Sequence, residues 1–575
     1  MVRRSLAPAS LLALLLLLTV GVVPPASAAA APPVKLAVLV VFDQLRGDYL
    51  TRWNDLFGAD GFRRLEKDGA WFTNCRYPYA GTVTGAGHAS LATGCSPWKH
   101  GIFNNDWYDR EEGRSVYCAT MSKYQRVPAP GAVVDTDNKP TKAKEGGSPE
   151  RLRAPTLADA FKEATAGQGR VVSLSFKDRG AVFTGGKKPD ACYWLDPETG
   201  EAVTSNYYRD KLEDWVEEFN KEKGADRYFG KDWTRLRTDI DYEKFSGPDD
   251  APGEALGYSN TTMGRTFPHP MDGGLKEPGK AYYESLYCSP FGNELLLDFV
   301  KRAVDVEKLG THDTPDLLCL SFSCTDPVGH VWGPDSQEVL DVTLRADRIV
   351  KGLLDHLDAK VGKGRYVLVL SADHGVCPLP EASVKQGREA KRILPSLLQQ
   401  GAEDFLHTTF AKDDAVGAKA FEAMVDQYIY LNRAWLNGHK LEQGKVEEAL
   451  ARWLTEQPGV QGAYTRTQLT KDFPADDAIG QRMKRSFYSA RGADVVVLVK
   501  PYNLLNARLT GTFHGSPHPY DTLVPLVVYG PGVHSGVRDD MVVPQAAVPI
   551  LARALGVKPP PDAEAGVPEK LFVEP

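Results

Sequence analysis

The sequence has no excess of basic residues. Its 575 residues include 68 lysines and arginines against 75 aspartates and glutamates, which gives a formal net charge of −7. Proteins that hold nucleic acid without regard to base sequence need a positive surface to neutralise the phosphates. We therefore expect no nucleic-acid partner, and a small molecule as the ligand.

Long apolar runs are also scarce, and the one candidate lies near the N-terminus. Residues 11–23 are mostly apolar but fall well short of the roughly 20 residues that span a bilayer, and Pro24-Pro25 ends the run. Arg3-Arg4 before it and the small residues 26–28 after it are typical of a secretory signal peptide. We expect cleavage of residues 1–28, no stable membrane insertion, and a periplasmic or secreted mature protein.

Cysteine is also scarce, with eight residues in the chain. Their spacing matches no zinc-finger pattern, and although export would permit disulfides, the sequence does not determine their pairing. No internal repeat is visible, and an apolar share of 42% is ordinary for a soluble globular protein. A chain of this length exceeds what one hydrophobic core usually serves, so we expect one large core with insertions.

Short runs rich in Val, Ile and Leu indicate the fold. They lie at residues 36–42, 171–176, 317–322, 366–370, 495–499 and 524–529. Buried parallel strands have this composition. Residues 337–361 carry apolar side chains at helical spacing, which predicts a crossover helix between the third and fourth strands. The predicted fold class is α/β, with a central, mostly parallel sheet flanked by helices.

Two segments fit the alternation of strands and helices poorly, and we interpret them as cap insertions. The predicted organisation is a signal peptide at 1–28, core at 33–191, a cap insertion at 192–285, core at 286–385, a second insertion at 386–490 and core at 491–575.

Polar side chains gather directly after the predicted strands, where the loops of an open parallel sheet converge on one crevice. They are Asp43, Lys177, Arg179, Asp326, His330, Asp373 and His374, with His514 ahead of the last strand. Three aspartates and three histidines make an oxygen and nitrogen ligand set that suits zinc best and divides into two sites. Manganese or cobalt would accept the same ligands.

The spacing within two pairs supports shared metal ions. Asp326 and His330 are four residues apart, which places both on one side of a helical turn. Asp373 and His374 are adjacent and would point apart along a strand, so they can share an ion only at the strand's end, where Gly375 eases the turn. Any one of these residues alone could be a helix cap or a packed histidine, so the prediction depends on the set.

Five motifs follow one another along the chain. They are Asp43 in Val-Phe-Asp-Gln-Leu-Arg, Thr84 in Thr-Val-Thr-Gly-Ala-Gly-His, Asp326-Pro-Val-Gly-His330, Ser371-Ala-Asp-His-Gly375 and Thr512-Phe-His-Gly-Ser-Pro517. As a set they resemble the alkaline phosphatase superfamily, in the branch shared with nucleotide pyrophosphatase/phosphodiesterases. The similarity covers residues 35–185, 286–380 and 490–535.

This resemblance implies two zinc sites and a threonine nucleophile. Asp326, His330 and His514 would hold one zinc, while Asp43, Asp373, His374 and the hydroxyl of Thr84 would hold the second. Residues 85–93 also predict a short helix ended by Gly94, which places Thr84 at a positive helix N-terminus, where metal coordination would ionise its hydroxyl. Thr82 is the nearest alternative nucleophile. The nearby polar residues His88, His100, His518 and Asp521 are expected to be structural or to support the ligands.

The segment Phe176-Lys-Asp-Arg-Gly180 bears on the substrate. It resembles the Lys-x-Arg pair of threonine-dependent alkaline phosphatases that cleave phosphate monoesters. Lys177 and Arg179 lie two apart, so an extended chain points both to one side, and a dianionic phosphate needs that extra positive charge. Asn105 occupies the position of the family's phosphate-binding amide, with Asn104 as the alternative. We therefore expect a monomeric phosphatase for small phosphate monoesters that forms a phosphothreonine.

Other functions on the same core would predict different motifs. A phosphodiesterase or nucleotide pyrophosphatase is the main alternative. A sulfatase would carry Cys/Ser-x-Pro-x-Arg, which Cys75-Arg-Tyr-Pro does not match, and a metal-dependent phosphoglycerate mutase would normally have serine in place of Thr84. A non-enzymatic binding protein would be expected to have lost a ligand or the nucleophile, and none is missing.

Overall fold

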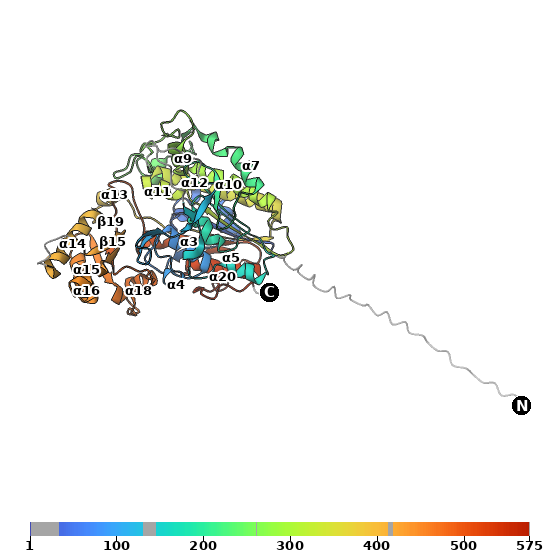
Figure 1. Cartoon of the computed structure of the whole chain (residues 1–575). Helices are drawn as coiled ribbons and strands as arrows, with labels where there is room; N and C mark the ends of the chain where they lie inside the picture. The colour runs from blue at the N-terminus through green and yellow to red at the C-terminus, as the bar shows by residue number, and fades with distance from the viewer. Residues whose placement is uncertain (2–33, 130–144, 260, 412–417, 574–575) are drawn as a thin grey trace.

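An eleven-stranded sheet forms the centre of the molecule in the computed structural model, which describes Met1 and residues 34–129, 145–259, 261–411 and 418–573. The strand order is β21-β2-β20-β13-β1-β12-β7-β8-β9-β5-β6. Helices lie on both sides of this sheet, and a smaller lobe stands beside it (Figure 1). The predicted α/β class is confirmed. The predicted signal peptide, apart from Met1, lies outside the described residues.

Parallel strands form the middle of the sheet. In spatial order they are β13 (Tyr366–Ser371), β1 (Leu36–Phe42), β12 (Asp316–Phe322), β7 (Val171–Ser175) and β8 (Ala191–Leu195). All their residues are buried, as expected for apolar strands covered on both faces. Val41 is opposite Ser371 and Phe42 is opposite Phe322, so the strands end together at one edge.

Most of the outer strands pair in antiparallel fashion, whereas the edge strand β21 (Gly536–Arg538) is parallel to its neighbour β2. β20 (Leu523–Tyr529) runs antiparallel to both β13 and β2 (Ala70–Arg76), and β9 (Ala202–Ser205) and β5 (Thr120–Val127) extend the other side. The prediction of a parallel strand at 524–529 is therefore wrong. A fully buried apolar strand has the same composition in either direction, and the path of the preceding chain decides its orientation.

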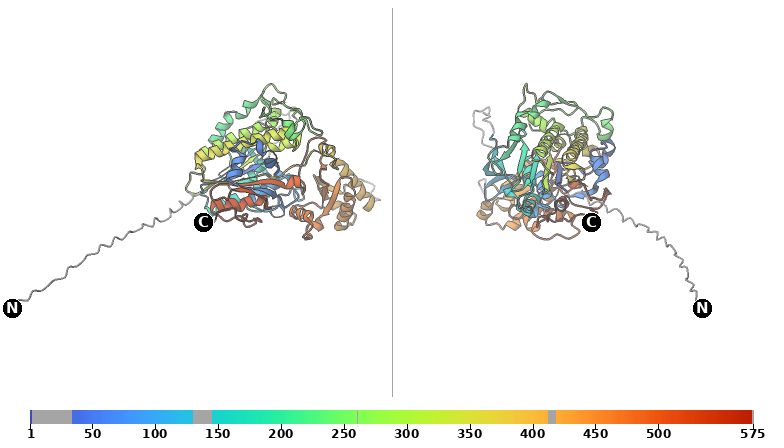
Figure 2. Two further views of the ribbon diagram at one scale, coloured as in Figure 1. Left: turned by 180° about the vertical axis from the view of Figure 1, so that it is seen from behind. Right: turned by 90° about the vertical axis from the view of Figure 1, so that its right-hand side faces the viewer.

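Two layers of helices cover the sheet (Figures 1 and 2). α10 (Pro290–Val306) and α12 (Gln337–Leu357) pack together on one side, and α3 (Thr84–Thr93), α5 (Leu157–Ala164) and α20 (Ala547–Leu555) on the other. α12 confirms the predicted crossover helix. It begins after Ser336, whose side chain accepts a hydrogen bond from the Val339 N–H at 3.1 Å.

The smaller lobe contains a separate antiparallel sheet, drawn in orange in Figure 1. Its strands, in spatial order, are β15 (Phe421–Val425), β16 (Tyr428–Leu431), β18 (Val495–Val499) and β17 (Val460–Thr465), packed against α14 (Pro395–Phe410) and α16 (Gln443–Thr455). The sequence places 495–499 among the core strands, and this is wrong. Its apolar residues indicate burial but not which sheet it joins.

On the opposite side, β8 and β9 continue the central sheet past residue 191, into the segment predicted as a cap. The domain boundaries themselves stay predictions. All eight cysteines are buried and unpaired in the part of the chain that the structure describes. No helix among the described residues is both long and apolar enough to cross a membrane.

Candidate active site

The predicted metal ligands converge at the edge where the parallel strands end. Asp43 follows β1, Asp373 and His374 follow β13, Asp326 and His330 lie on α11 (Thr325–Trp332) after β12, and His514 comes ahead of β20. All six side chains are buried, with at most 9% of their surface exposed. The common strand end therefore brings together residues from four distant parts of the sequence.

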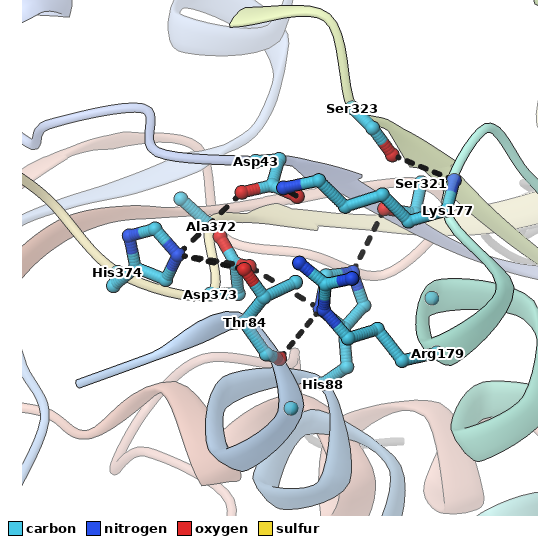
Figure 3. A network of polar contacts seen from close by, with 12 residues as sticks. Asp43, Thr84, His88, Lys177, Arg179, Ser321, Ser323, Ala372, Asp373 and His374 are labelled. Carbon is cyan, nitrogen blue, oxygen red and sulfur yellow. Dashed lines mark hydrogen bonds and ion pairs between the residues drawn. The ribbon is translucent and has the colours of Figure 1, made fainter. Parts of the chain in front are cut away.

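Thr84 is the first residue of α3 and faces the same edge (Figure 3). Its hydroxyl oxygen lies 3.2 Å from Nε2 of His374. Gly94, with φ +76°, ends the helix as predicted. The helix can approach the strand ends closely because Gly87 has no side chain, since a Cβ there would lie 2.2 Å from the carbonyl oxygen of Asp373.

Thr82, the alternative nucleophile, has a different role. Its hydroxyl donates to the carbonyl oxygen of Ser516 at 2.9 Å. His88, one turn along α3, is held between the Thr84 carbonyl oxygen at 2.9 Å and the Ser321 hydroxyl at 2.8 Å. The geometry therefore favours Thr84 as the reactive hydroxyl and gives Thr82 and His88 supporting contacts.

Two groups of side-chain atoms, among the described residues, are close enough to share a metal ion. One consists of Asp43, Asp373 and His374, and the other of Asp326, His374 and His514. The first coincides with the set predicted for the zinc that Thr84 completes. In the second, His374 takes the place of His330, whose Nε2 lies 3.2 Å from Oδ1 of Asp326. The structure thus brings all six predicted ligands together, and His374 belongs to both groups.

Backbone carbonyl oxygens orient the three imidazoles. In each case Nδ1 lies 2.8 Å from a carbonyl oxygen, that of Thr512 for His330, of Gly375 for His374 and of Thr82 for His514. A carbonyl oxygen can only accept, so Nδ1 carries the proton and donates it. The lone pair of Nε2 then faces the carboxylates, which is the tautomer that a metal ion needs.

The carboxylates have too few partners for their burial. Oδ1 of Asp43 and Oδ2 of Asp373 make no hydrogen bond within the described residues. The ammonium of Lys177 lies 2.7 Å from Asp43 and 2.6 Å from Asp326, and one positive charge does not balance three buried aspartates. Buried oxygens without partners are costly, and beside imidazole lone pairs they fit divalent ions of the zinc type.

Burial and the close approach of charged groups shift the pKa values of several predicted metal ligands. Burial raises the pKa of Asp43 well above its usual range, and the charge of Asp373 raises it further. Burial acts in the same direction on Asp326, but its interactions with His330 and with the Lys177 ammonium outweigh it and hold that pKa well below normal. Burial lowers the pKa of His514, so its imidazole stays neutral. Ionised carboxylate and neutral imidazole are the forms that bind metal, so these directions favour the binding form of Asp326 and His514, whereas Asp43 needs a nearby cation to favour its ionised form.

A cavity of about 380 Å³ opens beside Thr84, and all three residues predicted to bind phosphate line it. Lys177 precedes α6 (Asp178–Gly185) and Arg179 lies in the first turn of this helix, so both follow β7. Figure 3 shows the guanidinium of Arg179 on the side of Thr84 away from His374, while the side chain of Lys177 extends to the Asp43 carboxylate. The Thr84 hydroxyl therefore lies between the imidazole of His374 and the guanidinium of Arg179, and the second cation, Lys177, is paired with two of the ligand carboxylates.

The structure also separates the two candidate asparagines. Oδ1 of Asn105 accepts a hydrogen bond from the Gly85 N–H at 2.8 Å, and Asn105 lines the cavity. Asn104 donates instead to the Asp106 carbonyl oxygen and to Asp426, both at 2.8 Å, and does not line the cavity. This favours Asn105, whose NH₂ group remains available to a ligand.

Sequence reasoning missed two residues that hold the site together. Gln44 donates through its backbone N–H to Asp373 at 3.0 Å and through Nε2 to Asp326 at 2.6 Å. Its position directly after Asp43 in the first motif could have indicated that it lies at the site. Tyr117 accepts a hydrogen bond from Arg179 at 3.0 Å, and no sequence motif marks it.

Comparison with known proteins agrees with this geometry. The family model for type I phosphodiesterase / nucleotide pyrophosphatase matches residues 37–521. Three relatives match nearly full length: a protein named calcium-transporting ATPase from Myroides odoratus (31% identical, covering 94% of this chain and 95% of the relative), alkaline phosphatase PhoV from Synechococcus elongatus (30%, 92% and 90%) and alkaline phosphatase PafA from Elizabethkingia meningoseptica (31%, 87% and 88%).

The fold agrees with a solved structure as well. The crystal structure of PafA superposes with a TM-score of 0.85 at 30% identity, covering 95% of this chain and 100% of that chain. The family model and these relatives extend over most of the sequence, including the strand ends that carry the site. The chain therefore belongs to the type I phosphodiesterase / nucleotide pyrophosphatase family and, within it, is an enzyme of the alkaline phosphatase type.

Proposed function

We propose that this enzyme is exported and hydrolyses phosphate monoesters through a phosphothreonine formed on Thr84. Two zinc ions would be held by Asp326, His330 and His514, and by Asp43, Asp373 and His374 together with Thr84. The observation that carries the proposal is the position of the Thr84 hydroxyl, which lies 3.2 Å from His374 and lines the same cavity as Lys177 and Arg179.

Bound zinc ions would supply positive charge that favours the ionised hydroxyl and stabilises negative charge in the transition state. The Thr84 hydroxyl loses its proton to solvent, the resulting alkoxide attacks phosphorus, and the bond to the leaving oxygen breaks. The leaving group departs as the alcohol after taking up a proton from solvent. The phosphoryl group is then bonded to Thr84. The N-terminus of α3 favours the negative charge at this position.

Water completes the reaction. It attacks the phosphothreonine from the side that the leaving group vacated and gives up a proton to solvent, the bond between phosphorus and Thr84 breaks and returns the Thr84 alkoxide, and inorganic phosphate leaves. Lys177, Arg179 and Asn105 hold the non-bridging oxygens throughout, so the chain's own contribution is positioning and electrostatic stabilisation.

The cationic pair supports monoesters over diesters. A monoester phosphate carries two negative charges and three non-bridging oxygens, and a diester carries one charge and two such oxygens. Arg179 is held with its guanidinium at 3.0 Å from Tyr117, and the Tyr117 hydroxyl donates to Asp178 at 2.6 Å. A fixed guanidinium binds two phosphate oxygens at once, which favours the more highly charged substrate.

The test compares kcat/KM for p-nitrophenyl phosphate and bis(p-nitrophenyl) phosphate in the zinc-loaded wild type and a Lys177→Ala/Arg179→Ala variant. Losing two charge-assisted hydrogen bonds of about 1.5–3 kcal/mol each lowers monoester kcat/KM by roughly 10²–10⁴-fold. Diester hydrolysis should fall far less. The control Lys187→Ala/Lys188→Ala removes two exposed lysines near the same helix and should change neither rate.

Zinc content is measured in each variant, because Lys177 also contacts the ligand carboxylates. A diester preference that the double substitution leaves unchanged would refute the monoesterase proposal. It would favour the alternative, a phosphodiesterase or nucleotide pyrophosphatase, which the description of the family model also names. Export is tested separately by determining the N-terminus of the mature protein.

A further inference from the structure

One oxygen of the Asp521 carboxylate is hydrogen-bonded to the turn that follows His514. Asp521 lies on α19 (Pro519–Thr522) and is 1% exposed. Its Oδ2 accepts hydrogen bonds from the Gly515 N–H at 3.1 Å, the Ser516 N–H at 2.9 Å and the Ser516 hydroxyl at 2.5 Å. One buried oxygen therefore fixes the two residues directly after a predicted metal ligand.

The backbone of the same segment holds the turn after His374. The carbonyl oxygen of Asp521 accepts from the Gly375 N–H at 2.8 Å, and that of Tyr520 accepts from the Val376 N–H at 3.0 Å. The contact is close, because a Cβ on Gly375 would lie 2.1 Å from the Tyr520 carbonyl oxygen. Gly375 in turn supplies the carbonyl oxygen that orients the imidazole of His374.

A third connection reaches the nucleophile. The carbonyl oxygen of Ser516 accepts from the hydroxyl of Thr82 at 2.9 Å, and the carbonyl oxygen of Thr82 accepts from Nδ1 of His514 at 2.8 Å. Thr82 lies two residues before Thr84. The segment held by Asp521 is thus tied to both ligand turns and to the start of α3.

We propose that Asp521 is a positioning residue that holds His514, and through it the Thr84 segment, in register with His374 for metal binding. The inference rests on the proposed function, which supplies the metal. Asp521 is itself no ligand, because its carboxylate lies in neither group of atoms that could share an ion.

Removing the carboxylate leaves three donors of two half-buried residues, Gly515 and Ser516, without their acceptor. Gly515, with φ +114°, has no side chain to restrict the freed turn, so His514 loses its fixed direction. Residues that orient metal ligands typically contribute 10–100-fold to metal affinity. We therefore expect Asp521→Ala to release zinc at least about tenfold faster than the wild type.

The other carboxylate oxygen allows a sharper test. Oδ1 of Asp521 has no hydrogen-bond partner within the described residues. Asparagine can keep its oxygen toward Gly515 and Ser516 and place its NH₂ group where Oδ1 lies. Asp521→Asn should therefore retain zinc nearly as well as the wild type. Ser516→Ala removes one of the three donors and should accelerate release by a few fold.

Asp347 provides a matched control. It is 5% exposed and accepts hydrogen bonds from the Gly58 N–H at 2.8 Å and the Phe62 N–H at 2.7 Å, with no contact to the metal ligands. Asp347→Ala removes an equally buried carboxylate, so it should lower the thermal unfolding temperature without accelerating zinc release.

The experiment loads each full-length variant with zinc and follows transfer of the metal to a colorimetric chelator. Fast release from Asp521→Ala, intermediate release from Ser516→Ala and slow release from Asp521→Asn and Asp347→Ala are expected. Equal release from Asp521→Ala and the wild type, or equally fast release from Asp347→Ala, overturns the positioning role. If Asp521→Ala does not fold, Ser516→Ala decides, and release at the wild-type rate overturns the role. Failure of the wild type to retain zinc would instead refute the proposed function, and with it this inference.

Discussion

Replacing Glu254 with glutamine should stabilise the protein at alkaline pH. Glu254 is 1% exposed, and neither of its carboxylate oxygens has a hydrogen-bond partner among the described residues. Burial, followed by the charge of Glu338, raises its pKa from 4.5 to about 9. The folded protein therefore keeps this carboxyl group protonated at neutral pH.

The sign of the effect follows from proton binding. Between pH 4.5 and 9 the unfolded chain has released the proton and the folded chain has not, so raising the pH favours unfolding. The loss is about 1.4 kcal/mol of unfolding free energy per pH unit, or about 4 kcal/mol between pH 5 and pH 8. Glutamine resembles the protonated acid and does not titrate, so it removes this loss.

The assay is urea unfolding of the wild type and Glu254→Gln at pH 5, 6.5 and 8, at one fixed zinc concentration. The two proteins should differ little at pH 5, and the variant should gain steadily to about 4 kcal/mol at pH 8. Glu448→Gln, at an exposed position, serves as the control and should follow the wild type. Parallel pH curves for wild type and Glu254→Gln would show that Glu254 is ionised in the folded protein and would refute the reasoning.

Four further outcomes are expected. Thr84→Ala should lower kcat by at least about a thousandfold with zinc content unchanged in a metal analysis, and unchanged turnover would exclude Thr84 as the nucleophile. Tyr117→Phe frees Arg179 from a hydrogen bond of about 1 kcal/mol and should lower monoester kcat/KM several-fold while sparing the diester, as measured by steady-state kinetics. Gly87→Ala places a Cβ 2.2 Å from the Asp373 carbonyl oxygen and should reduce both the unfolding temperature and zinc retention, which normal values would contradict. Chelation of zinc from the wild type should lower its unfolding temperature, since a ligand that binds only the folded state stabilises it.

Much of the site was predictable because its residues stand at strand ends. Asp43, Asp326 and Asp373 follow apolar runs that form neighbouring parallel strands, and the common edge brings them together. Tyr117 could not be found this way. It reaches Arg179 from β4 (Arg114–Tyr117), outside the central sheet, and only side-chain contact reveals it.

Backbone contacts between distant parts of the chain could not be predicted from the sequence either. Gly375 and Asp521 are separated by well over a hundred positions, and their backbone hydrogen bond joins two ligand turns. Nothing in the local sequence of either residue indicates the other. The predicted export, the monomeric state and the lack of a nucleic-acid partner stay predictions.

By itself, the sequence determined which segments are buried strands, where the chain turns, and which side chains bear the chemistry, because periodicity and turn residues are local properties. Only the tertiary structure decided that β20 is antiparallel, that β18 joins the smaller lobe, and that Asn105 rather than Asn104 lines the cavity. These depend on contacts between distant parts of the chain, and a buried apolar strand can satisfy its backbone hydrogen bonds in more than one sheet and in either direction.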